Sequence, residues 1–101
     1  MVSISQFAEQ LRKRGYSVEP DARVTGESGQ VHSVDGLALG GDGGKVIWLE
    51  RRGHPTMEII KAFAIAMDVG AEACYVSDIR LADEDRKLAE SYKMRVLEKD
   101  G

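Results

Sequence analysis

The chain has 101 residues, of which 43% are hydrophobic and 31% are charged, and its formal net charge at neutral pH is −3. This length suits one folded domain with a modest core, so we expect a single domain spanning residues 1–101. The hydrophobic content excludes a disordered tail. The near balance of charges excludes a uniformly basic protein of the histone kind, although a local basic patch can still bind nucleic acid.

The lone cysteine and the lack of long apolar runs both indicate in which cellular compartment the protein resides. Cys74 lies in an apolar run, which is typical of a small core residue, and it cannot form an internal disulfide. No run approaches the roughly 18 apolar residues of a membrane span, and the N-terminus lacks a hydrophobic signal core. We therefore expect no membrane segment and a cytoplasmic protein.

The N-terminal half predicts one helix and three strands. Ser3 and Gln6 have the spacing of a capping box, an apolar repeat follows at helical spacing, and Gly15 marks the end of this helix. Pro20 interrupts a short strand from Tyr16 to Val24, which places that strand at a sheet edge or a bulge. Further strands are expected over residues 30–39 and 45–51, joined by the glycine-rich turn at 40–44.

A long apolar helix is predicted between Pro55 and Gly70. The helical repeat assigns its core face to Met57, Ile60, Phe63, Ala64 and Met67, while Ile59, Ala62, Ile65 and Ala66 make its flanks apolar too. A helix that is apolar nearly all round is covered on more than one side. We therefore expect a homodimer through the 55–69 helix.

The C-terminal part predicts a buried strand at 73–76, a charged helix at 83–92 and a closing strand at 94–97. Strand, helix and strand in this order indicate a parallel pair. The fold class is therefore α/β, with a mixed β-sheet flanked by helices and the element order α-β-β-β-α-β-α-β.

Two carboxylates fall on the strands that form the predicted hairpin, Asp35 on the first and Glu50 near the end of the second. If the turn uses residues 41–44, Asp35 lies opposite Glu50 on one face, with Cβ atoms roughly 5 Å apart. Two facing carboxylates favour a shared hard cation such as Mg²⁺, and Arg52 would project toward the same place as a phosphate clamp. The alternative is that both acids are ordinary surface charges, or ion-pair partners of Arg51 and Arg52.

The sequence resembles the Mrr-type restriction-endonuclease-like domains of the PD-(D/E)XK nuclease superfamily over about residues 11–97. The residues that carry the resemblance are Gly15–Glu19, His32-Ser33-Val34-Asp35, Ile47–Arg52, Asp68-Val69-Gly70-Ala71 and Leu88–Tyr92. The resemblance implies a mixed sheet with helices on both faces, and metal-dependent hydrolysis of DNA phosphodiesters.

Asp35 corresponds in this resemblance to the metal-binding aspartate, and Glu50 to the acidic residue of the (D/E)-x-K motif. Arg52 stands where the family has its catalytic lysine. Because arginine keeps its proton, it can stabilise a phosphate but cannot act as a base. Either Lys61 on the following helix compensates, or activity is weak or lost. Glu9 corresponds to an acidic residue that many relatives carry on the first helix.

Two functions therefore remain open at the level of sequence. One is a Mg²⁺-dependent endonuclease with Asp35, Glu50 and Arg52 at its site. The other is a catalytically degenerate nuclease-fold module for nucleic-acid binding or dimerisation. A junction-resolving dimer is a third possibility, because such enzymes share the fold and a similar chain length.

Overall fold

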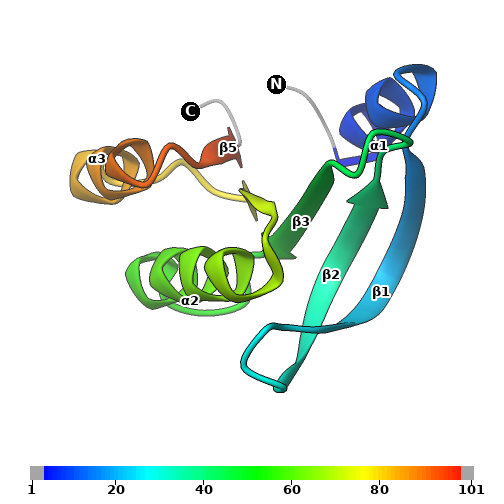
Figure 1. Ribbon diagram of the computed structural model, residues 1–101. Coiled ribbons are helices and arrows are strands. Elements are labelled where there is room, and N and C mark those ends of the chain that lie inside the picture. Colours follow the sequence, from blue (N-terminus) through cyan, green and yellow to red (C-terminus); the bar gives the residue numbers. More distant parts are fainter. Residues whose placement is uncertain (1–3, 99–101) are drawn as a thin grey trace.

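Helices cover both faces of a five-stranded sheet in the computed structural model, which describes residues 4–98 (Figure 1). The elements follow the predicted order: α1 (Ile4–Lys13), β1 (Ser17–Thr25), β2 (Val31–Leu39), β3 (Lys45–Glu50), α2 (Pro55–Val69), β4 (Glu72–Ser77), α3 (Asp83–Ser91) and β5 (Arg95–Glu98). The strands lie side by side in chain order. The β1–β2 and β2–β3 pairs are antiparallel, and the β3–β4 and β4–β5 pairs are parallel.

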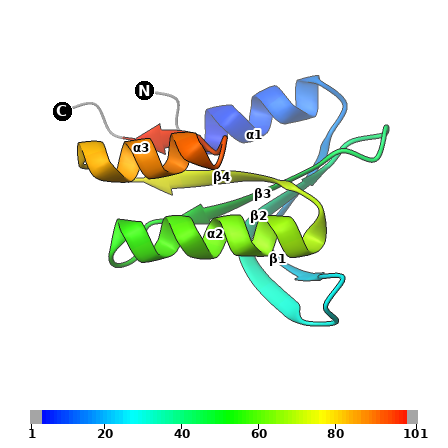
Figure 2. The same cartoon turned by 60° about the vertical axis from the view of Figure 1, so that its left-hand side comes forward.

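The sheet separates two hydrophobic clusters, and α1 and α2 lie on its opposite sides (Figure 2). The larger cluster packs α2 and α3 against one face, with Ile47, Ile59 and Tyr75 fully buried. The smaller cluster packs α1 against the other face, where the rings of Phe7 and Trp48 meet edge to face at 5.9 Å. Within residues 4–98 no helix has the length and apolar character needed to cross a membrane.

The helix boundaries follow the signals that the sequence carries. Gly15 has a positive φ of 90° just after α1, and Gly70 adopts the left-handed conformation that ends α2. Pro55 occupies the first turn of α2, where its missing N–H would have no helical partner. Ser3, the predicted capping residue of α1, lies outside the described residues.

The prediction for the core face of α2 was wrong. Its buried residues are those that the sequence analysis assigned to the flanks, together with Val69: Ile59, Ala62, Ile65, Ala66 and Val69. Met57, Ile60 and Met67 are instead 66%, 41% and 68% exposed. Helical periodicity could not choose between the faces, because both are apolar.

The predicted hairpin register was wrong by one residue. Leu39 pairs with Lys45 and Gly36 pairs with Trp48, so the connection comprises all of residues 40–44. A slip of one residue exchanges the faces of every side chain. Continued along the strands, the observed register brings Asp35 level with Leu49 and not with Glu50.

The side chains of β1 and β2 change face near Asp35, so Asp35 does not follow the predicted alternation of side chains between the two faces of the sheet. Leu37 and Val34 both face the α2 side of the sheet, although their positions differ by three and strict alternation would put them on opposite faces. On β1, Asp21 has a positive φ of 47° and is missing from a ladder that pairs the residues on either side of it. The β1–β2 pairing keeps one register on both sides of Asp21, so both strands change face together at this level, and the Asp35 side chain turns toward the end of β3.

Candidate functional site

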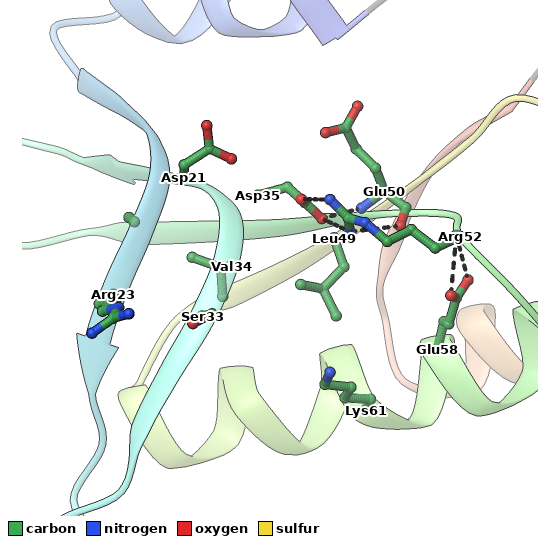
Figure 3. A pocket seen from close by; sticks show the side chains of 11 residues that line it. Asp21, Arg23, Ser33, Val34, Asp35, Leu49, Glu50, Arg52, Glu58 and Lys61 are labelled. Carbon is green, nitrogen blue, oxygen red and sulfur yellow. Dashed lines mark hydrogen bonds and ion pairs between the residues drawn. The ribbon is translucent and has the colours of Figure 1, made fainter.

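A pocket of about 390 Å³ opens at the carboxyl end of β3 (Figure 3). Asp35 from β2, Glu50 from β3, Arg52 from the following loop and Lys61 from α2 all line it. The structure therefore brings the predicted site residues to one place. Glu9 is not part of its lining; it lies on α1 and forms an ion pair with Arg12 at 3.8 Å.

The Asp35 carboxylate is fully engaged by the protein itself. Its side chain is 6% exposed, and its Oδ2 atom accepts hydrogen bonds from the Glu50 amide at 2.7 Å and from Arg52 Nη1 at 2.9 Å. Arg52 Nη2 donates to Oδ1, which completes a two-pronged ion pair. This fork geometry is the strongest arrangement that arginine and a carboxylate can form.

The ion pair fixes the charge state of both partners. Burial alone would raise the pKa of Asp35, but the hydrogen bonds from Arg52 and Glu50 and the positive charge of Arg52 outweigh it and lower the pKa. The hydrogen bonds to Asp35 also raise the pKa of Arg52 still further. Arg52 is therefore a permanent cation at this site, and it cannot accept a proton from water.

Glu50 does not join Asp35 as a second carboxylate ligand. Its backbone N–H contacts Asp35, whereas its exposed carboxylate points to the side of the strand away from Lys61 and Glu58 (Figure 3). Within residues 4–98 no group of three or more potential ligands among His, Cys, Asp and Glu could hold a metal ion. In this arrangement the donor set does not fit Mg²⁺, because a guanidinium takes up the oxygens that Asp35 would offer to the ion.

Glu58 on α2 holds the backbone that carries Arg52. Its carboxylate accepts hydrogen bonds from the Arg52 amide at 3.1 Å and the Gly53 amide at 2.8 Å, and from the Tyr75 hydroxyl at 2.5 Å. Burial would raise the pKa of Glu58, but these hydrogen bonds lower it. The Glu58 carboxylate thus ties the loop after β3 to the first turn of α2, and this tie positions the Arg52 side chain.

Sequence reasoning missed two carboxylates beside the pocket. Glu58 stands in the first turn of α2, where an acidic residue is common for helix-dipole reasons alone. Asp21 lines the pocket from β1, and it follows the proline that the sequence analysis placed at an edge or bulge. The Pro-Asp pair in a strand was the available signal for Asp21, whereas no local pattern marked Glu58.

Comparisons with known proteins were made for both the sequence and the structure. Neither a protein-family model nor a curated protein matches the sequence. A protein of unknown function, AF1548, has a similar structure, with a TM-score of 0.70, 17% identity, and coverage of 91% of this chain and 54% of its own. A repair endonuclease from Pyrococcus abyssi aligns with a TM-score of 0.63 and 13% identity, covering 96% of this chain and 45% of its own.

EndoMS, in a complex with double-stranded DNA, aligns with a TM-score of 0.56 and 15% identity, covering 99% of this chain and 45% of its own. The chain thus spans about half the length of these three proteins. At such low identity the likeness concerns the fold and not the activity. It confirms the predicted fold class: this chain has the mixed sheet and flanking helices of an endonuclease-like fold.

Proposed function

We propose that this protein is a nuclease-fold module that binds nucleic acid, with hydrolysis impaired by the arginine at position 52. The observation that carries the proposal is the two-pronged ion pair between Arg52 and the buried Asp35. A general base is missing where the resemblance expects a lysine, and the metal-binding aspartate is neutralised by a cation of the protein itself.

Nucleic-acid binding is supported by cations around the pocket. Arg52 is 67% exposed, so one edge of its guanidinium can meet a phosphate while the other holds Asp35. Arg23 and Lys61 line the same pocket. Two of the structural neighbours are a repair endonuclease and a protein in a complex with double-stranded DNA, which makes duplex DNA the first ligand to test.

Mg²⁺-dependent hydrolysis of DNA is the second candidate function. It is favoured by the gathering of Asp35, Glu50, Arg52 and Lys61 around one pocket. For this function Asp35 would have to release Arg52, and the Glu50 side chain would have to turn toward Asp35.

We also propose Mrr-type ancestry, a single domain over residues 1–101 and a cytoplasmic location. These three proposals rest on the sequence patterns given above.

Binding and cleavage measured side by side test the proposal. We expect a labelled duplex to bind at low salt, with affinity that falls as salt rises. We expect a supercoiled plasmid to stay intact in millimolar Mg²⁺ or Mn²⁺. Metal-dependent nicking that disappears in Asp35→Ala would instead establish the second candidate, and absence of both binding and nicking would exclude a role on duplex DNA.

The Arg52→Lys variant separates impairment at this position from a wider loss. An ammonium makes a single point contact with a carboxylate, and it can lose its proton more easily than a guanidinium. We expect this variant to gain metal-dependent nicking over the wild type. If it folds and binds DNA but gains no nicking, more than one element of the hydrolytic site has been lost.

A further inference from the structure

An apolar stripe runs along the outer face of α2 and has no partner among the described residues. It consists of Met57, Ile60, Ala64 and Met67, all exposed, at spacings of three, four and three residues. These spacings place the four side chains on one face of the helix. Exposed methionine and isoleucine side chains in a continuous stripe are characteristic of a surface that binds another protein.

We propose that this stripe is the interface of a homodimer, in which α2 packs antiparallel against α2 of a second copy across a two-fold axis at Ala64. A small residue at the crossing point lets two helices approach closely. The same symmetry brings Ile60 of each copy against Met67 of the partner subunit. The stripe is therefore complementary to itself, as a two-fold interface requires.

Charge on the flank of the stripe selects this register over its nearest alternative. Moving the axis toward residue 62 would place Ile60 opposite Ala64 of the partner subunit, but it would also bring Lys61 close to Lys61 of the partner subunit. With the axis at Ala64, Lys61 instead lies near Asp68 of the partner subunit. Hydrogen bonds from Ser28 and His32 lower the pKa of Asp68 to about 2, so the opposing group is an anion at neutral pH.

The size of the stripe predicts a dimer of modest affinity. Two helices of this length that meet along one face bury on the order of 1,000 Å² in total, at or below the lower end of specific interfaces. We therefore expect a dissociation constant in the micromolar range and rapid exchange between monomer and dimer.

Sedimentation equilibrium of the full chain between about 1 μM and 1 mM tests the association, with Ile60→Glu and Ile79→Glu as a matched pair. Ile60 and Ile79 are 41% and 44% exposed, but only Ile60 lies on α2. We expect Ile60→Glu to weaken dimerisation at least tenfold and Ile79→Glu to leave it unchanged. A wild type that stays monomeric throughout this range, or equal effects of the two variants, overturns the proposal.

A cross-linking experiment tests the position of the axis. The native Cys74 is buried, and burial raises the pKa of its thiol to about 12, so it does not compete in disulfide formation. We expect Ala64→Cys to give a disulfide-linked dimer on mild oxidation, whereas Ala82→Cys, at an exposed position before α3, stays monomeric. A dimer that forms without a cross-link at position 64 would show that another surface, or another register, is used.

Discussion

Replacing Arg52 with alanine leaves the buried Asp35 carboxylate with a single hydrogen bond, from the Glu50 amide. Hydrogen bonds to charged groups contribute about 1.5–3 kcal/mol each when they are shielded from water. Arg52 is 67% exposed, so solvent screens the pair and the loss falls toward the low end. We expect Arg52→Ala to lower the free energy of unfolding by about 1–2 kcal/mol, or Tm by about 5–15 °C.

A double-mutant cycle with Asp35→Asn isolates the ion pair from other effects of the substitution. Asparagine keeps the shape of the side chain and an acceptor for the Glu50 amide but removes the charge. Urea unfolding of the wild type, both single variants and the double variant gives the coupling energy, which we expect to be about 1–2 kcal/mol. Additivity within about 0.5 kcal/mol would refute the inference that the two side chains act as a pair.

The pH dependence of stability provides a second, independent test of the ion pair between Arg52 and Asp35. The folded-state pKa of Asp35 is lowered, so its stabilising contribution is complete above the ordinary aspartate value near 3.9 and is lost as pH falls through the folded value. Without Arg52, burial raises this pKa, and ionisation of Asp35 then opposes folding. Arg52→Ala should therefore lose more stability at pH 7 than at pH 3, and an equal loss at both pH values contradicts the assignment.

Two further predictions concern the scaffold around the site. Gly36→Ala would place a Cβ atom 1.8 Å from Trp48 Cζ2, so we expect a loss of about 1–3 kcal/mol in urea unfolding, whereas Gly41→Ala, with nothing within 4 Å, should be neutral. Asp68 has a pKa of about 2 because Ser28 and His32 donate hydrogen bonds to it, so its hold on the β1–β2 loop is complete above about pH 4 and is lost toward pH 2. The chemical shift of the Ser28 amide should follow this titration in the wild type and become independent of it in Asp68→Asn.

The order of elements was predictable because each boundary carries its own local signal. Gly15, Pro55 and Gly70 act through backbone conformation, which depends little on the rest of the fold. These features are local, and local features are what a single sequence encodes most directly.

The contacts of Asp35 were not predictable in the same way, because they depend on two small geometric changes. The turn uses residues 40–44 where 41–44 was expected, and the shift beside Asp21 moves one half of β2 to the opposite face. Each change moves a side chain by one residue along its strand. A move of one residue turns the side chain to the other face of the sheet, where it meets different neighbours. The sequence therefore identified four of the residues that line the pocket, Asp35, Glu50, Arg52 and Lys61, but not the partner of each.

Arginine and lysine at position 52 would give different sites even with the same backbone. The guanidinium of Arg52 matches both oxygens of Asp35, whereas an ammonium would contact one of them and leave the other free for a cation. In the proposed function, arginine at this position would remove a base and would also engage the aspartate that the resemblance assigns to metal binding. A single residue can account for both departures from the nuclease pattern, which is why its reversal is the most direct test of impairment.

The proposed dimer would place the Asp35–Arg52 pockets of its two copies on one side of the pair. Lys61 and Asp68 lie on the flank of α2 that faces β2 and the β1–β2 loop, the flank on which the pocket also opens. A two-fold axis perpendicular to both helices keeps equivalent flanks on the same side of an antiparallel pair. Both pockets would then face one ligand, and a DNA duplex has the matching symmetry, since its two strands are themselves related by two-fold axes. If the dimer forms, Ile60→Glu should therefore weaken binding to duplex DNA more than binding to a short single strand. An equal effect on both ligands would show that dimerisation does not contribute to DNA recognition.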